Sequence, residues 1–174
     1  MNDCAELIDE TASAAGFAKQ IIGLDHIAVA VPDLEQAISW YCAALGFNLV
    51  ERRTTYGVST SMISAVVRAG QAIVVLVQGV EPESQVSRFV HEFGPGVQHV
   101  AFTVKNIDAV LSELHSRGDS ADTAVLVEEG IRQVFLRRSP ATGVRIELIE
   151  RNGGDFTDDS VRRLFLSMES REIY

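Results

Sequence analysis

The chain has few of the features that would direct it to secretion or to a membrane. It contains 2 cysteines in 174 residues, too few for a disulfide framework, so Cys4 and Cys42 are interpreted as ordinary thiols. No apolar run approaches the roughly 20 residues of a membrane helix, and the N-terminus lacks the basic start and apolar block of a secretory signal. We therefore expect a cytoplasmic protein that does not bind membranes.

Lysine is also scarce, because Lys19 and Lys105 are the two lysines and the other basic residues are arginines. The 24 acidic side chains outnumber the 15 basic ones and give a net charge of −9. Such a charge repels the phosphate backbone of nucleic acids, which are therefore not expected as partners.

The chain has 4 prolines and no linker-like stretch, and 47% of its residues are hydrophobic. This composition is typical of a globular domain with a substantial core. We expect residues 22–174 to form one domain, and residues 1–21 to form an N-terminal arm or a short helix.

Two segments of the sequence share one pattern at a separation of 73 residues. Each has a β-rich run with a histidine near its start, His26 in the first and His99 in the second. A helix-capping residue follows each run, Asp33 or Asn106, and an apolar helical pattern comes next. The match therefore indicates a repeated structural unit.

Three further β-like runs follow the helix in each half, so the sequence predicts two βαβββ modules, over residues 22–80 and 95–151. Neither module is large enough to bury its own sheet. The predicted fold class is therefore α+β, with the modules forming a curved eight-stranded sheet around a metal cavity. An amphipathic C-terminal helix over residues 157–173 is expected to close the domain.

The two histidines share strand faces with alanines, which leaves room for an ion beside His26 and His99. A third candidate ligand is Glu147, a carboxylate inside an otherwise apolar strand. A buried carboxylate without a partner is costly, so this position favours a cation. The sequence thus predicts a metal site made by two histidines and one glutamate.

The repeat does not supply a fourth ligand. The position equivalent to Glu147 in the first module is residue 74, where the chain has Ile73, Val74 and Val75. Two histidines and one carboxylate with open positions are typical of non-haem Fe(II) oxygenases. Zinc, manganese or cobalt could occupy the same ligands.

These features together resemble the vicinal oxygen chelate superfamily over about residues 22–173. Within it, the chain is similar to the catalytic, C-terminal half of the 4-hydroxyphenylpyruvate dioxygenase and hydroxymandelate synthase family. The stretches that carry this resemblance are Ser64-Ala65-Val66-Val67, Ser84-Gln85-Val86, Gly94-Pro95-Gly96-Val97-Gln98-His99-Val100-Ala101, Gln133-Val134-Phe135, Ile146-Glu147-Leu148-Ile149-Glu150-Arg151 and Leu164-Phe165-Leu166-Ser167-Met168-Glu169.

The resemblance implies roles for individual residues. His26, His99 and Glu147 match iron ligands. Superfamily members that act as glyoxalases or epimerases usually have a glutamine or glutamate as a fourth metal ligand, at the position where this chain has an apolar residue. Strict strand alternation directs Gln98 away from His99, so the role of Gln98 rests on the resemblance alone. The residues that match the substrate pocket or its lid are Ser64, Gln78, Gln85, Gln98, Gln133, Phe135, Phe156 and Ser160.

Two departures from the family concern the substrate. The phenylalanines that enclose an aromatic ring in the family are replaced by Arg145 and Val161. Arg145 shares a strand face with Glu147, so we expect it to point into the cavity and hold an acidic group. The alternative for Arg145 is a structural ion pair with Glu147 or a neighbour. The family's N-terminal half is missing, and ordinary 4-hydroxyphenylpyruvate is not the expected substrate.

We therefore expect an Fe(II)-dependent dioxygenase that acts on a small 2-oxo acid, or a similar bidentate acid, together with O₂. A non-redox lyase, isomerase or epimerase is the alternative, with Glu51 as the candidate base on the early strands. A third possibility is a metabolite- or drug-binding resistance protein. The resemblance also implies a homodimer.

Overall fold

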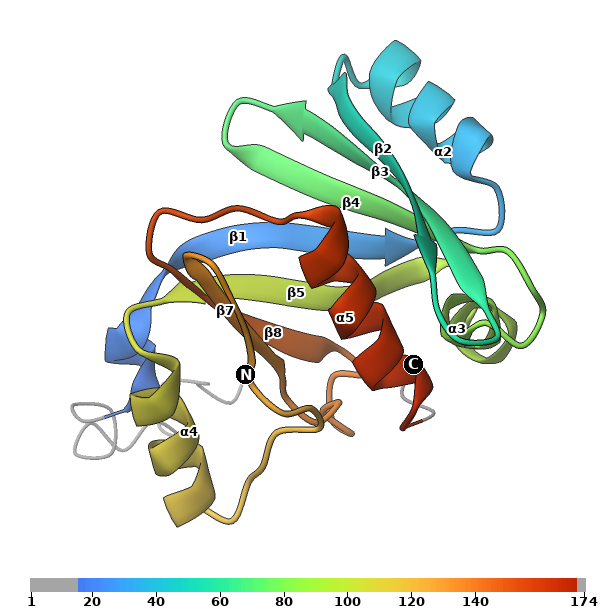
Figure 1. Ribbon diagram of the computed structural model, residues 1–174. Helices are drawn as coiled ribbons and strands as arrows, with labels where there is room; N and C mark the ends of the chain where they lie inside the picture. Colours follow the sequence, from blue (N-terminus) through green and yellow to red (C-terminus); the bar gives the residue numbers. More distant parts are fainter. Residues whose placement is uncertain (1–15, 172–174) are drawn as a thin grey trace, which may run out of the picture.

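The computed structural model describes residues 16–171, and a single eight-stranded sheet forms its centre (Figure 1). The strands are β1 (Ile21–Ala30), β2 (Asn48–Tyr56), β3 (Ser61–Ala69), β4 (Ala72–Gly79), β5 (Gly96–Val104), β6 (Leu126–Glu128), β7 (Ile131–Phe135) and β8 (Arg145–Arg151). The helices are α2 (Leu34–Ser39), α3 (Gln85–Phe93), α4 (Ile107–Ser116) and α5 (Asp158–Glu169), with a short 3-10 turn η2 (Phe17–Gln20) and a π-helical turn η3 (Trp40–Ala44).

The sheet has the order β2-β3-β4-β1-β5-β8-β7-β6 and consists of two equivalent halves. β1 and β5 pair antiparallel at the centre, β4 runs parallel to β1, and β8 runs parallel to β5. The remaining strands follow in the same order outward on both sides. The α+β fold with two βαβββ modules, predicted from the sequence, is therefore confirmed.

The helices of the two modules begin in the same way. The Asp33 side chain accepts a hydrogen bond from Gln36 N, and the Asn106 side chain accepts one from Ala109 N, each at 2.9 Å. Such caps satisfy backbone donors that the first helical turn leaves without partners, and each is worth about 1 kcal/mol. Gly46, with φ of 73°, follows η3 and ends the first helical segment.

Two of the core clusters lie on the outer side of the sheet. Leu34 and Ile38 of α2 pack on β3 and β4, and Ile107 and Val110 of α4 pack on β7 and β8. Because these helices cover the outer side, the concave side of each half is left for α5 and a cavity. In Figure 1, α2 and α4 lie at opposite ends of the molecule, with α5 across the middle.

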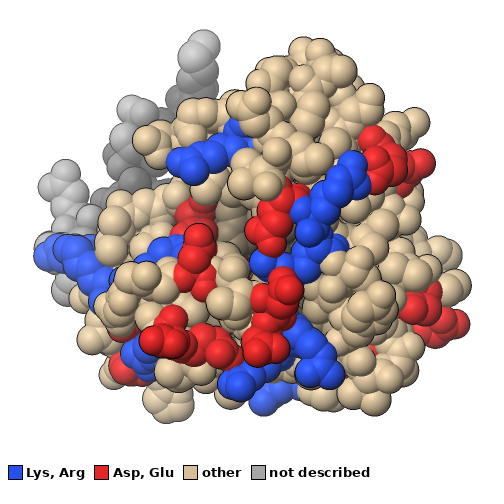
Figure 2. All heavy atoms as spheres, turned by 45° about the horizontal axis from the view of Figure 1, so that its top comes forward, with Lys and Arg blue, Asp and Glu red and all other residues tan. Residues whose placement is uncertain are grey.

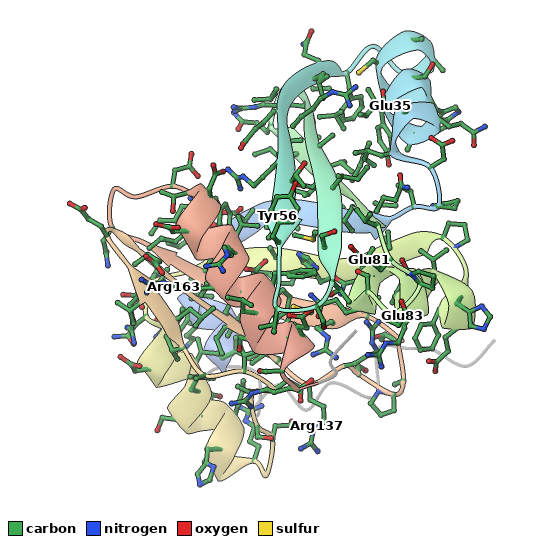
Figure 3. All side chains as sticks on the ribbon, turned by 45° about the vertical axis from the view of Figure 1, so that its right-hand side comes forward. Glu35, Tyr56, Glu81, Glu83, Arg137 and Arg163 are labelled. Carbon is green, nitrogen blue, oxygen red and sulfur yellow. The ribbon has the colours of Figure 1, made fainter. Side chains whose placement is uncertain are left out.

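The closing helix α5 contacts both edge strands of the sheet. Arg162 Nε donates to the Tyr56 carbonyl of β2 at 3.2 Å, and Arg163 forms an ion pair with Glu128 of β6 at 3.0 Å. Figure 3 shows Tyr56 and Arg163 on opposite sides of this helix. The helix thus joins the two outermost strands across the concave side.

Some boundaries differ from the sequence-based expectation. The β-like runs in the second half of the sequence predict strands near residues 123–127, 133–137 and 144–150. In the structure, β7 begins at Ile131 and pairs with β6 through a tight turn at Gly130, whose φ is 72°. Residues 1–15 of the expected N-terminal arm lie outside the described residues. Between residues 16 and 171, no helix is long and apolar enough to cross a membrane.

Candidate metal centre

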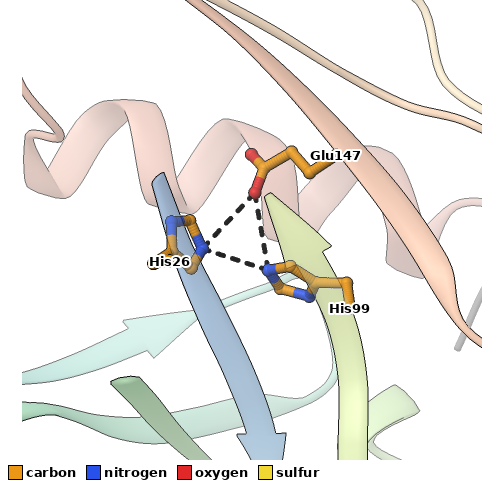
Figure 4. Close-up of side chains that lie close together, drawn as sticks. All are labelled: His26, His99 and Glu147. Carbon is orange, nitrogen blue, oxygen red and sulfur yellow. Dashed lines mark hydrogen bonds and ion pairs between the residues drawn. The ribbon is translucent and has the colours of Figure 1, made fainter. Parts of the chain in front are cut away.

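Three side chains converge from neighbouring strands: His26 of β1, His99 of β5 and Glu147 of β8 (Figure 4). The two Nε2 atoms lie 3.2 Å apart. Glu147 Oε2 lies 3.5 Å from His26 Nε2 and 3.4 Å from His99 Nε2. Residues 16–171 contain this one group of three or more potential ligands at metal-binding distance.

Strand register explains how the three ligands meet. Ala101 on β5 pairs with His26 on one side and with Glu147 on the other. Ala101 is fully buried and has no side chain beyond Cβ. The small residue therefore leaves the space in which the longer side chains on either side approach one another, as the sequence pattern predicted.

The outer nitrogen of each histidine has its own partner. His26 Nδ1 lies 2.9 Å from Asp25 Oδ1, and His99 Nδ1 is hydrogen-bonded to Gln98 Oε1. A partner that accepts a hydrogen bond from Nδ1–H leaves Nε2 with a free lone pair, which is the form that binds a metal. Asp25 and Gln98 occupy equivalent positions in the two modules.

The position of Gln98 differs from strict strand alternation, which directs it away from His99. The β1–β5 pairing shifts register between Ala28 and Val29, where Gln98 is the extra residue on β5. A second shift makes Asp25 the extra residue on β1. A bulge redirects the side chain of its extra residue, so both residues lie beside the histidines that follow them.

The electrostatics favour a cation among these groups. Burial raises the pKa of Glu147 to about 7, and burial, with smaller contributions from Arg145 and Arg138, lowers the pKa of His99 to about 3. An isolated negative charge is therefore costly at Glu147, while His99 is held neutral. Neutral imidazoles and a carboxylate that lacks compensation are suitable metal ligands.

The carboxylate of Asp25 lies in a different environment from that of Glu147. Burial tends to raise its pKa, but hydrogen bonds from His26 and Arg151 outweigh burial and bring the pKa well below its usual range. Thr103 Oγ1 also donates to this carboxylate at 3.0 Å. Asp25 is therefore ionised and fully engaged in positioning its neighbours.

The three ligands fit a divalent ion. For metal–ligand bonds of about 2.0–2.2 Å, adjacent ligand atoms lie roughly 3.0–3.5 Å apart, which matches the three separations around His26, His99 and Glu147. In the described chain, Glu147 Oε1 is buried without a hydrogen-bond partner. A buried oxygen of this kind requires either a cation or a donor from a bound molecule.

The structural equivalent of Glu147 in the first module is Val75. Val75 pairs with Ala28, which in turn pairs with His99, and this row mirrors the one formed by Glu147, Ala101 and His26. Counting by the repeat length predicted residue 74, one position away. Because valine offers no donor atom, the described residues supply three candidate ligands at this centre.

The centre lies on the wall of a cavity of about 270 Å³. β1 to β5 and β8 form its floor and walls, and Phe156, Val161 and Leu164 enclose it from the side of α5. Figure 2 shows acidic and basic side chains side by side across the middle of one face of the molecule. The cavity is thus enclosed by an apolar lid and has charged residues among its lining.

Three of the residues predicted to bind substrate line this cavity: Ser64, Phe156 and Val161. Ser64 lies on β3 and pairs with Val77 of β4. The Phe156 ring stands edge-on to His26 with centroids 5.8 Å apart. These positions are compatible with substrate contact beside the metal ligands.

Two of the glutamines predicted to bind substrate are hydrogen-bonded to other groups of the protein. Gln78 Oε1 accepts a hydrogen bond from Leu34 N at 2.6 Å and so satisfies the first turn of α2. Gln98 is bound to His99, as described above. Neither residue lines the cavity.

The other two glutamines contact the backbone of the closing segment. Gln85 Nε2 donates to the Phe165 carbonyl at 3.5 Å, and Gln133 Nε2 donates to the Ser160 carbonyl at 3.4 Å. Ser160 itself is buried in the capping box at the start of α5 with Thr157. These predicted residues therefore position the helix that covers the cavity.

Phe135 and Arg145 lie outside the cavity lining. The Phe135 ring packs edge-on against His99 at a centroid distance of 5.0 Å. Arg145 is buried and donates to Asp122 at 2.6 Å, so the structure shows the ion pair with a neighbour rather than a side chain in the cavity. Its pairing partner in the sheet is the cavity-lining His99, so the ion pair with Asp122, and not the strand register, directs the side chain elsewhere.

Several cavity residues were not predicted from the sequence. Arg53 and Arg68 come from β2 and β3, Arg151 ends β8, and Leu164 lies on α5. Alternation along β3 could have identified Arg68, because it lies four residues after Ser64 on the same strand face.

The chain belongs to the glyoxalase/bleomycin resistance protein/dioxygenase superfamily, whose model matches residues 23–148. This class agrees with the paired βαβββ modules and with the position of the candidate metal centre between them.

Relatives of two kinds are similar to the chain. Mitochondrial methylmalonyl-CoA epimerase of Mus musculus is 32% identical over 130 residues, which cover 72% of this chain and 71% of that protein. A probable 4-hydroxyphenylpyruvate dioxygenase 2 of Aspergillus fumigatus is 29% identical over 135 residues, covering 75% of this chain but 31% of that protein. A variant of 4-hydroxymandelate synthase from Streptomyces coelicolor has the same fold, with a TM-score of 0.74, 23% identity, and coverage of 94% of this chain and 57% of that one.

Proposed function

We propose that the protein is a metal-dependent enzyme whose substrate presents two neighbouring oxygen atoms to an ion held by His26, His99 and Glu147. The convergence of three ligand atoms at 3.2–3.5 Å carries this proposal. A bound ion would supply Lewis acidity and, if it is iron, redox chemistry. The proposed ion is Fe(II), with zinc, manganese and cobalt as alternatives.

The first candidate reaction is non-redox proton transfer, as in an isomerase, a lyase or an epimerase. It is supported by the identity with methylmalonyl-CoA epimerase over most of both chains. Glu51 of β2 lines the cavity and lies in the cross-strand row with Val66 and Val75. It is ion-paired with Arg53 and partly exposed, and in this reaction it would remove the proton from the substrate carbon.

The second candidate reaction is oxygen activation on a 2-oxo acid. It is supported by Val75, because a site with three protein ligands leaves room for both the acid and O₂. The apolar lid of Phe156, Val161 and Leu164 would exclude water from a reactive site. The chain also shares its fold with a variant of 4-hydroxymandelate synthase over 94% of its length.

One experiment separates these reactions. Protein loaded anaerobically with Fe(II), Co(II), Zn(II) or Mn(II) is incubated in D₂O with 2-oxo acids and with 2-branched acyl thioesters. Deuterium uptake at the substrate carbon next to the carbonyl, measured in the absence of O₂, supports proton transfer. O₂ consumption with release of CO₂ supports the oxygenase.

The control variant is Glu147→Gln, which removes the anionic ligand at nearly constant volume. Glu147→Gln should bind no metal and should lose whichever of the two activities the wild-type protein shows. The proposal would be contradicted if Glu147→Gln kept the wild-type activity, or if the wild-type protein bound no metal. Metal-independent ligand binding that survives in Glu147→Gln would instead indicate a metabolite- or drug-binding protein.

A further inference from the structure

Three arginines line the cavity, and they differ in how their charges are compensated. Arg53 and Arg151 each form ion pairs with two carboxylates of neighbouring segments. Their charges are therefore satisfied by the protein, and their side chains are fixed in place. Arg68 has a different environment.

Arg68 lies near the end of β3, and its Nε donates to the Gly70 carbonyl at 3.0 Å. Within residues 16–171, no carboxylate lies within 4.0 Å of its guanidinium, whose two Nη atoms have no partner there. A guanidinium presents paired N–H groups that match the two oxygens of a carboxylate or phosphate. Arg68 is thus a cavity-lining cation that is available for an anion.

Sheet register fixes where this cation stands relative to the metal centre. Val66 pairs with Val75, the residue equivalent to the third ligand, and Arg68 pairs with Ile73. Residues 66 and 68 share one strand face, so the backbone of Arg68 lies about 7 Å further along the strand than that of Val66. The cation therefore stands at a distance from the metal along one wall.

The part of the wall that β3 and β4 form between these two points is apolar, and Glu51 lies beside it on β2. Val66, Ile73 and Val75 line it from β3 and β4, and Val50 of β2 lines the same cavity. An apolar wall gives no partner to polar groups in the middle of a ligand, but it stabilises hydrocarbon. Metal centre, apolar wall and guanidinium thus follow one another in that order.

We propose that Arg68 binds the oxyanion at the far end of the substrate. The substrate class is then a small acid with two chelating oxygens at one end, an apolar middle and a carboxylate or phosphate at the other end. The chelating end of this inference rests on the proposed function. Arg68 would have the role that the sequence suggested for Arg145, whose charge is compensated by Asp122.

Binding of acids to the Co(II)-loaded protein tests the proposal. The probes are 2-oxo monocarboxylates and 2-oxo dicarboxylates of increasing chain length, with phosphono analogues of the diacids to separate carboxylate from phosphate. The visible Co(II) spectrum reports chelation, and titration calorimetry reports binding independently of it. We expect one diacid or phosphono acid to bind about tenfold more tightly than the monoacid of equal length, from a charge-assisted hydrogen-bonded pair.

Arg68→Met should abolish this preference and leave the affinity for monoacids unchanged. The matched control is Arg52→Met, because Arg52 precedes the cavity-lining Arg53 and pairs with Glu35 instead. Equal affinity of wild-type protein for diacids and monoacids, or a preference that survives in Arg68→Met, would overturn the proposal. If calorimetry shows binding that depends on Arg68 but the Co(II) spectrum does not change, the anion site is supported. Only the proposed chelation of the metal by the substrate is then contradicted.

Discussion

At the scale of single residues, the two histidines of the centre are not equivalent, although the repeat places them at equivalent positions. His26 is hydrogen-bonded to the ionised Asp25, whereas His99 is hydrogen-bonded to the neutral amide of Gln98. A carboxylate behind an imidazole increases the basicity of the ligating nitrogen. His26 should therefore be the stronger of the two metal ligands.

Replacing Asp25 by asparagine should weaken metal binding, because it removes the charge but keeps a hydrogen-bonding group. We expect affinity for Zn²⁺ to fall about 10–100-fold, as measured by competition with a chelating dye. Asp155→Asn is the control, since Asp155 pairs with the same Arg151 but does not contact His26. Equal affinities for the two variants would argue against the role of Asp25.

Metal affinity should also depend on pH through Glu147. Its pKa in the metal-free protein is raised to about 7, so binding must displace a proton at lower pH. Affinity should fall about tenfold per pH unit below about pH 7 and change little above it. The lowered pKa of His99 keeps that ligand neutral over this range. Calorimetric titrations from about pH 5 to about pH 8 measure the slope, and a flat profile below about pH 7 would contradict it.

The stability of the metal-free protein should change with pH in the direction set by the same carboxyl. Because folding raises the pKa of Glu147 from 4.5 to about 7, the folded state favours its protonated form. The contribution of the Glu147 carboxyl to the free energy of unfolding is complete below about pH 4.5, with a maximum of about 3 kcal/mol. This contribution is lost as the pH rises through about 7. Glu147→Gln should remove this dependence in urea denaturation.

Single residues also show the limits of prediction from sequence. The two histidines and the glutamate were identified because strand alternation and the repeat both apply to them. Strand alternation predicted the wrong direction for two side chains. A bulge turns Gln98 toward His99, and the ion pair with Asp122 holds Arg145 away from the cavity. Bulges and distant ion-pair partners leave no local signal in a sequence.

At the scale of elements, α5 depends on one carboxylate for its attachment to the β2–β3 connection. Glu169 accepts hydrogen bonds from the backbone N–H groups of Val58, Ser59 and Thr60 at 2.7, 3.3 and 2.9 Å. Burial opposes ionisation, but these bonds and one from the Thr60 hydroxyl lower the pKa of Glu169 to about 2. The helix that covers the cavity is therefore fastened at its C-terminal end.

Glu169→Gln should loosen this attachment, because the amide offers one acceptor oxygen and no charge. We expect a loss of about 1–2 kcal/mol in the free energy of unfolding at neutral pH. Since folding lowers the pKa, the wild-type contribution should be complete above about pH 4.5 and disappear as the pH falls through about 2. Urea denaturation of Glu169→Gln and of the exposed control Glu83→Gln measures the difference, and equal losses would contradict it.

The elements themselves were largely predictable. Capping residues such as Asp33 and Asn106, and the stop at Gly46, define the helices of each module within the local sequence. The short strands β6 and β7 begin at Leu126 and Ile131, three and two residues away from the predicted starts at residues 123 and 133. Their ends are set by the turn at Gly130, where Gly154 N donates to the Gly130 carbonyl from a distant part of the chain.

At the scale of the whole molecule, the pseudo-symmetry of the sheet is broken at one functional position. The first module has Val75 where the second has Glu147. Val75→Glu should add a fourth protein ligand, raise Zn²⁺ affinity and lower any activity that needs open coordination positions. Ile73→Glu is the control on the same strand face, two residues away. Unchanged Zn²⁺ affinity in Val75→Glu would show that residue 75 is not equivalent to the ligand.

The superfamily resemblance also predicts a homodimer, which concerns the whole molecule. Sedimentation equilibrium of the metal-loaded protein should give a mass near twice the 19.0 kDa of one chain. A monomer at all concentrations would contradict this prediction.

The pairing of β1 with β5 places one histidine on each side of the boundary between the modules. Neither half of the chain alone therefore contains a complete set of ligands. During synthesis, residue 147 leaves the ribosome after His26 and His99, so the set of ligands is incomplete until most of the chain has been made. If the proposed ion binds there, its capture would be a late event, and a stably bound ion would report that both halves have assembled.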